Sequence, residues 1–189
     1  MNDELINFLR ERTAEGAAGT TALRNQGDKG VIQRARSFLK SLDLRAFSKC
    51  TTEVKFMVLL DESTVALQNF FPPAARNWGA ARKVLNLYLR DVFYNRYLCD
   101  HFNFDHLESW LELPLDSFAA KGIQKDALKT QGFTYGQHTL ERFPGIKYLT
   151  REVNEAYQQS AASIASTRGF ARVHLDIIYW RDVGQEGKK

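Results

Sequence analysis

Apolar residues recur every three or four positions along most of this chain, and this spacing is typical of amphipathic α-helices. One clear stripe lies in residues 31–42, where the apolar positions are Val31, Ala35, Phe38, Leu39 and Leu42. The same kind of pattern predicts helices over residues 3–12, 53–71, 80–102, 104–112, 117–128, 135–143 and 150–167. We therefore expect an all-α fold, a helical bundle in one domain that covers residues 1–189.

Glycine and proline mark the breaks between these helices. Residues 16–30 contain four glycines and no apolar period, so we expect a flexible loop over about 13–30. Pro72 and Pro73 end the helix that precedes them. Residues 170–180 are open to two interpretations, because their β-branched content suits a strand while Val173, Ile177 and Trp180 are spaced as in a helix. We favour the helix.

The segment 80–102 has the longest and most apolar pattern, with apolar side chains around most of its circumference. A helix of this kind belongs at the centre of a bundle. Its main polar line near the start consists of Lys83, Asn86 and Arg90, which are three and four residues apart and share one face. Any chemistry on this helix is expected on that line.

Composition excludes several classes of protein. With 189 residues, 44% of them hydrophobic and 25% charged, the chain is long enough for a core without disulfides. Two cysteines cannot build a disulfide framework, and His101 and His106 lack companions that would make a metal site. We see neither a secretion signal nor an apolar run of membrane-spanning length. We expect a monomer in the cytoplasm, associated with the nucleoid, with no cofactor, no metal and no membrane partner.

Charge is unevenly distributed although its net value is only +4. Residues 76–102 carry five Lys/Arg against two Asp, and residues 119–151 carry six against two acidic residues. Between them, residues 103–118 hold four acidic residues and no basic ones. This order suits a polyanion-binding surface with a carboxylate in its middle, and it also fits an ordinary solvated surface.

Lys83 and Asp116 form a candidate catalytic pair. Lys83 falls just inside the predicted start of the central helix, where the positive end of the helix disfavours a cation and favours an anion. An amine there would hold phosphate, or lose its proton and act as a nucleophile. Asp116, in the turn-like Pro-Leu-Asp-Ser, would be its partner. A solvated surface lysine and a simple helix cap at Asp116 are the structural alternatives.

The helices at 53–71 and 80–102, with their short connection, resemble a helix–hairpin–helix over about 53–102. In such an element the hairpin amides and the second helix start hold a DNA phosphate. The order of hairpin glycine, Arg-Lys, Asn and a later Leu-Asp-Ser resembles the helix–hairpin–helix DNA glycosylase superfamily. On this match Lys83 is the nucleophile and Asp116 the catalytic aspartate. The DNA-binding residues it implies are Arg76, Trp78, Gly79, Ala81 and Arg82.

Within that superfamily the chain is most similar to the archaeal 8-oxoguanine glycosylases, which share a longer separation between lysine and aspartate. That branch has a second basic residue two turns after the lysine, matched here by Arg90. It also has an Asp-x-x-x-Trp that contacts the extruded base, matched by Asp176 and Trp180. Gln33 is the candidate for a glutamine in the base pocket. A pairing of Asp176 with Arg172, one turn earlier, is the alternative.

The resemblance implies a base-excision repair enzyme that acts on double-stranded DNA with a damaged base. It implies a bifunctional enzyme, a DNA N-glycosylase with AP lyase activity, that removes an oxidised purine such as 8-oxoguanine through a Lys83 Schiff base. A non-catalytic helix–hairpin–helix module that binds DNA or protein is the alternative, and a helical scaffold unrelated to DNA is the third possibility. A basic cleft shared by Lys83 and Asp116, with Trp180 on its wall, would favour the enzyme.

Overall fold

The computed structural model describes residues 2–27, 30–129, 140 and 142–186 of the chain. All regular structure in these residues is helical, which confirms the predicted all-α class. The α-helices are α1 (Asp3–Ala17), α2 (Val31–Ser41), α3 (Leu44–Ser48), α4 (Glu53–Phe70), α5 (Trp78–Tyr94), α6 (Arg96–Phe102), α7 (Ser117–Lys129), α8 (Arg151–Thr167) and α9 (Leu175–Glu186). Short 3₁₀ turns are η1 (Pro73–Ala75), η2 (Asp105–Leu107), η3 (Ile146–Tyr148) and η4 (Arg172–His174).

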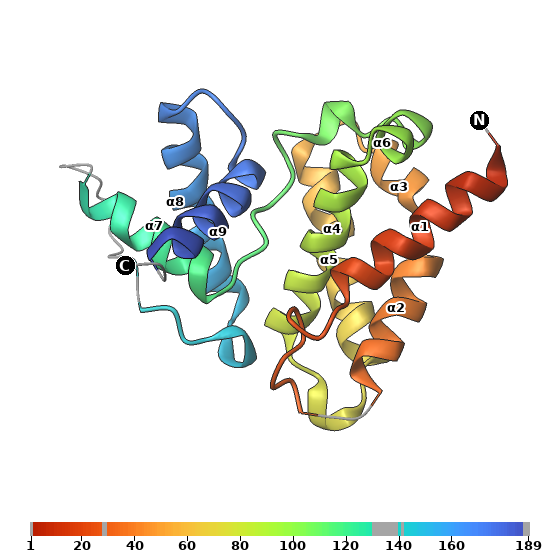
Figure 1. Cartoon of the computed structure of the whole chain (residues 1–189), viewed down its shortest axis with the longest axis horizontal. Helices are drawn as coiled ribbons and strands as arrows, with labels where there is room; N and C mark the ends of the chain where they lie inside the picture. Colours follow the sequence, from red (N-terminus) through yellow and green to blue (C-terminus); the bar gives the residue numbers. More distant parts are fainter. Residues whose placement is uncertain (1, 28–29, 130–139, 141, 187–189) are drawn as a thin grey trace.

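The helices gather into two halves, which lie on opposite sides of Figure 1. The N-terminal half contains α1 to α6, and the C-terminal half contains α7, α8 and α9. Each half has its own cluster of buried apolar side chains. The segment that follows η2 runs from one half to the other and ends at α7 (Figure 1).

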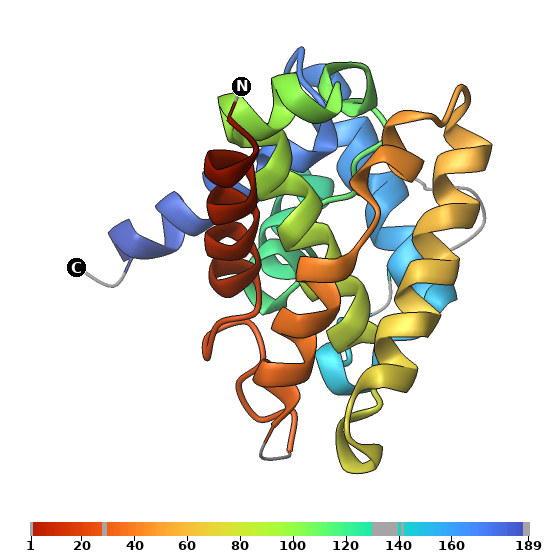
Figure 2. The ribbon, with the colours of Figure 1, turned by 90° about the vertical axis from the view of Figure 1, so that its right-hand side faces the viewer.

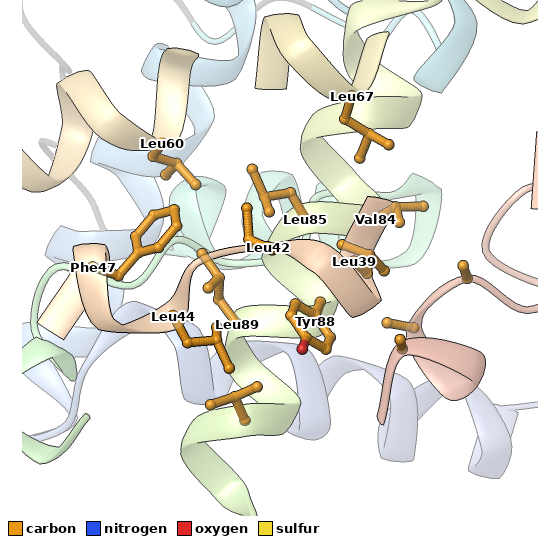
Figure 3. Packing of buried hydrophobic residues seen from close by; sticks show 14 of the residues in the cluster. Leu39, Leu42, Leu44, Phe47, Leu60, Leu67, Val84, Leu85, Tyr88 and Leu89 are labelled. Atoms are coloured by element: carbon orange, nitrogen blue, oxygen red, sulfur yellow. The ribbon is translucent and has the colours of Figure 1, made fainter. Parts of the chain in front are cut away.

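Helix α5 is the centre of the N-terminal half, as its sequence predicts. It packs against α1, α2, α4 and α6, and Figure 2 shows it between α1 and α4. In Figure 3 its side chains point among leucines of the neighbouring helices. Full burial of each such side chain contributes about 1.5–3 kcal/mol. The labelled side chains from α5 are Val84, Leu85, Tyr88 and Leu89.

Side-chain caps explain several helix boundaries. The Thr52 hydroxyl accepts a hydrogen bond from the backbone N–H of Lys55 at the start of α4. The Thr150 hydroxyl accepts one from the backbone N–H of Val153 at the start of α8. These caps satisfy N–H groups that the first helical turn leaves unpaired. Pro72 follows the end of α4 closely. The helices predicted over 53–71 and 150–167 are confirmed, each to within one residue.

The prediction of one helix over 80–102 is wrong, because the chain breaks at Asn95. The backbone of Asn95 leaves the helical region with ψ of 104°, and its side chain accepts from the N–H groups of Tyr97 and Leu98. Asn95 therefore ends α5 and caps α6. Helix α5 also begins at Trp78, two residues before the predicted start.

The predicted helix over 104–112 is also wrong beyond its first turn. Only η2 is helical, residues 108–110 form a turn, and residues 111–116 belong to no helix. The side-chain amide of Gln158 instead binds both backbone groups of Leu113, accepting from its N–H at 2.9 Å and donating to its C=O at 2.8 Å. Pro114 further favours an extended conformation at Leu113.

Three further predictions have mixed outcomes. Helix α1 continues to Ala17, so the first five residues of the predicted 13–30 loop are helical. Residues 170–180 contain helix and no strand, with α9 beginning at Leu175 and continuing past Trp180. The helix predicted over 135–143 lies mostly outside the described residues.

Candidate active site

A pocket of about 410 Å³ opens between the two halves of the molecule. The pocket is lined by residues of α1, α5 and α9, of the loop after α1 and of the segment that leads into α7. We call it the central pocket. Five residues that the sequence analysis selected line it together: Lys83, Arg90, Asp116, Asp176 and Trp180. Lys83 and Asp116 thus share one cleft with Trp180 on its wall, but two basic and two acidic residues line it, so it is not the basic cleft that we expected.

Lys83 projects into this pocket from the second turn of α5 and is only 6% exposed. Its Nζ lies 3.5 Å from Oδ2 of Asp116. Burial lowers the pKa of Lys83 below its ordinary value, the Asp116 carboxylate opposes this effect, and the charge of Arg90 adds to it. Because α5 begins at Trp78, the helix terminus that we invoked lies more than one turn away, and burial is the main cause.

Asp116 caps α7 and also pairs with Lys83. Its Oδ1 accepts hydrogen bonds from the N–H groups of Phe118 at 2.9 Å and Ala119 at 3.0 Å, at the start of α7. Its Oδ2 faces Lys83. The cap thus fixes the orientation of the carboxylate while one oxygen stays available to the pocket.

Asp176 and Arg90 form an ion pair, and both residues line the pocket. Arg90 also donates from Nε to Asp91 at 2.9 Å. Oδ1 of Asp176 is buried and has no hydrogen-bond partner among the described residues. A buried acceptor without a donor costs free energy, so this oxygen favours an occupant that offers an N–H or O–H.

The alternative pairing of Asp176 with Arg172 is not observed in the described structure. Arg172 donates to the backbone carbonyls of Leu111 and Trp110 and forms an ion pair with Glu53. Trp180 is 40% exposed and packs edge-on against Phe118, with 4.9 Å between the two ring centroids. One face of the pocket is therefore aromatic as well as charged.

Three residues predicted to bind DNA, Gly79, Ala81 and Arg82, are buried, which does not fit a direct contact with a phosphate. Arg82 is 2% exposed, and its guanidinium binds Glu112 and Asp61. Ala81 is fully buried. Gly79 is also buried, and a Cβ there would lie 2.3 Å from the carbonyl oxygen of Ile146, so its role is to let η3 pack against α5.

The other two predicted DNA contacts differ from each other. Trp78 is half-buried and packs with the C-terminal core, and its Nε1 is buried without a hydrogen-bond partner in the described structure. Arg76 is exposed, in the connection between α4 and α5. These two helices are consecutive and packed together, but whether they form a helix–hairpin–helix stays a prediction.

Gln33 does not belong to the central pocket. It is exposed on α2 and lines a separate hollow beside Gln26 and Arg36. Its assignment to the base pocket is therefore wrong. A single residue outside any motif gave no information about which face of α2 would approach α5.

Glu112 is the functional neighbour that the sequence analysis missed. It is 2% exposed and accepts from Nε and NH2 of Arg82 at 2.8 and 2.9 Å and from Asn86 at 2.8 Å. Burial is the largest single effect and would raise the pKa of Glu112, but the charge and hydrogen bonds of Arg82, with Arg172 and Asn86, together outweigh it and the pKa lies below its ordinary value. Glu112 thus anchors the segment that carries Asp116 to the helix that carries Lys83.

The described residues contain no group of three or more His, Cys, Asp or Glu arranged to hold a metal ion. No helix among them is long and apolar enough to cross a membrane. Cys50 and Cys99 are both buried free thiols. No protein-family model, no curated protein and no solved structure matches this chain.

Proposed function

We propose that this protein is a base-excision DNA glycosylase with AP lyase activity, and that Lys83 is its nucleophile. The observation that carries the proposal is the buried Lys83–Asp116 pair, with 3.5 Å between amine and carboxylate, in a pocket that also contains Asp176 and Trp180. Its partner would be double-stranded DNA with a damaged base. The resemblance to 8-oxoguanine glycosylases suggests an oxidised purine as the substrate.

The chemistry follows from the two groups. Breaking an N-glycosidic bond develops positive charge on the sugar, and the Asp116 carboxylate would stabilise that charge. The neutral amine of Lys83 would attack C1′ and form a Schiff base, which permits strand cleavage by β-elimination. The lowered pKa of Lys83 makes the neutral amine available at a lower pH than in an exposed lysine.

Base recognition would use Asp176 and Trp180, which also line the central pocket. An extruded purine offers N–H groups, and the unpaired Oδ1 of Asp176 is an acceptor for one of them. Trp180 offers an aromatic face that offsets part of the cost of unstacking the base. Arg90 would hold Asp176 in place for this contact.

The alternative, a non-catalytic helix–hairpin–helix module, has less support. Such a module would bind phosphate through its hairpin alone, and it gives no reason for the central pocket. It also gives no reason for a buried lysine opposite a buried carboxylate, since burial of charge is costly. It predicts salt-sensitive DNA binding without release of any base.

Asp116→Asn is expected to slow release of 8-oxoguanine from duplex DNA by about 100-fold or more, because the electrostatic partner of the transition state is lost. The amide oxygen of asparagine can still cap α7, so the fold should persist. Release is measured by separating the free base, and folding by circular dichroism. Asp116→Ala is the comparison, since it should also lose about 1 kcal/mol of stability. Full activity in the asparagine variant would contradict the proposed role.

Arg76→Ala is expected to weaken binding to undamaged duplex DNA and to reduce the slope of log K against log salt by about 0.9, the value for one phosphate contact. Arg76 is the exposed member of the predicted DNA-binding set. Arg96→Ala is the control, because this arginine is 89% exposed on α6 and forms only a long ion pair with Asp100. Equal slopes for the two variants would remove Arg76 from the interface.

A further inference from the structure

A chain of three hydrogen-bonding side chains runs from the central pocket toward solvent. Tyr94 lines the pocket, and its hydroxyl lies 2.7 Å from Nδ1 of His174. Nε2 of His174 lies 2.6 Å from Oε1 of Glu108. The side chain of Glu108 is 47% exposed, whereas that of His174 is 24% exposed. The chain therefore links a solvent-exposed carboxylate to a hydroxyl at the pocket.

The donors and acceptors in this chain have a fixed order. The Glu108 carboxylate can only accept, so Nε2 of His174 carries a proton in either charge state. When His174 is neutral, Nδ1 is an acceptor and the Tyr94 O–H must point at it. When His174 is protonated, Nδ1–H donates to the Tyr94 oxygen, and the Tyr94 proton is free to point elsewhere.

We propose that protonation of His174 turns the Tyr94 hydroxyl into a hydrogen-bond donor toward the central pocket, and that Tyr94 then protonates the departing base. This rests on the proposed glycosylase function. Tyr94 would be a catalytic residue, the general acid of base release. His174 and Glu108 would be positioning residues that set the direction of the hydrogen bonds and return the proton.

The proton and electron balance of the step is complete. The bond from C1′ to the base nitrogen breaks, and its electron pair stays on that nitrogen. A nitrogen or oxygen on the edge of the base that lies away from the sugar takes the proton of the Tyr94 hydroxyl, because Tyr94 lies about 16 Å along α5 from Lys83. The Tyr94 oxygen takes the Nδ1 proton of the His174 imidazolium. The Lys83 amine forms the new bond to C1′ and releases one proton to solvent. Nδ1 of His174 takes a proton back from water that enters the pocket after the base has left.

Other charged groups near Tyr94 and His174 are compatible with proton transfer by these residues. Arg90 and Asp91 on α5 and Glu108 act on Tyr94, and burial is the largest cause of its raised pKa, so that its hydroxyl keeps its proton. Arg172 belongs to η4, as His174 does, and Asp176 belongs to α9, which follows directly. Both are committed to other partners. The remaining contacts of His174 are the rings of Phe93, Tyr94 and Phe170.

The hydrogen-bond order is tested without any substrate. Nitrogen-15 NMR of the histidine rings in the free protein should show His174 protonated only at Nε2 at high pH and at both nitrogens at low pH. Tyr94→Phe should change the Nδ1 shift of His174. A neutral form protonated at Nδ1, or a spectrum unaffected by Tyr94→Phe, would overturn the proposal.

The catalytic step is tested by comparing two reactions of the same enzyme. Release of 8-oxoguanine from a duplex needs a proton for the base, whereas borohydride trapping on a preformed abasic site does not. Tyr94→Phe and His174→Gln should each slow base release by about 100-fold while trapping is unchanged. In the wild-type protein the ratio of release to trapping should fall as pH rises, because the step needs the protonated form of His174. This fall should be absent in His174→Gln.

Matched controls are Tyr97→Phe and His106→Gln, because both residues are exposed and neither lines the pocket. Loss of release and trapping together in the Tyr94 and His174 variants would indicate structural damage and overturn the proposal. Unchanged release in both variants would overturn it while leaving the proposed function intact. A wild-type protein that neither releases base nor traps DNA would overturn both.

Discussion

Replacing Lys83 with glutamine is expected to abolish the covalent complex that borohydride traps between this protein and 8-oxoguanine duplex DNA. Only an amine can form the Schiff base that borohydride reduces, and an amide has no nucleophilic electron pair on its nitrogen. Glutamine retains hydrogen-bonding capacity toward Asp116 at a site where the lysine is 6% exposed. The trapped product is counted by denaturing gel electrophoresis, and folding is checked by circular dichroism.

Lys55→Gln is the matched control for this experiment. Lys55 is exposed on α4 and does not line the central pocket, so its loss should leave trapping unchanged. Trapping that survives in the Lys83 variant, or that disappears equally in the Lys55 variant, would refute the assignment of the nucleophile.

The pH dependence of trapping on abasic DNA gives a second test of Lys83. Its pKa is lowered, mainly by burial, so the fraction of neutral amine should rise with pH and level off below the ordinary lysine value of about 10.4. The Asp116 carboxylate favours the charged amine. Asp116→Asn should therefore move the rising limb of the profile to lower pH. A shift to higher pH would contradict this electrostatic assignment.

Local patterns predicted much of the fold. The helical class, the central position of α5 and the bounds of α4 and α8 follow from apolar spacing and capping residues, which act within one or two turns. The Lys83–Asp116 pair was predicted from the order of residues along the chain. The structure adds that both side chains are buried in one pocket, which no local pattern contains.

Two of the failed predictions share a cause, which is competition from distant partners. Arg82 is next to Lys83 in a basic dipeptide, but its ion pair with Glu112, thirty residues later, holds its side chain in the interior. The same pairing and the Gln158 contact keep residues 111–116 from forming a helix. At Asn95 the opposite happens, because a local cap interrupts an apolar pattern that would otherwise continue.

Glu112→Ala is expected to reduce the free energy of unfolding by about 3–5 kcal/mol, the cost of removing one partner from a buried ion pair. Arg82 would be left 2% exposed with only its contacts to Asp61 and Thr64. Urea unfolding followed by circular dichroism measures the change. Glu15→Ala is the control, since its ion pair with Lys40 is partly exposed and should be worth no more than about 1 kcal/mol.

Two further measurements separate a charge effect from a cavity at Glu112. A double variant, Arg82→Met with Glu112→Leu, should recover most of the lost stability, because both charges leave the interior together. The pKa of Glu112 is lowered by folding, so its contribution is present above the unfolded value of about 4.3 and is lost as pH falls through the folded value. Acid should therefore destabilise the wild-type protein more than Glu112→Gln. Equal acid sensitivity, with no recovery in the double variant, would mean that packing rather than charge holds the two halves together at this point.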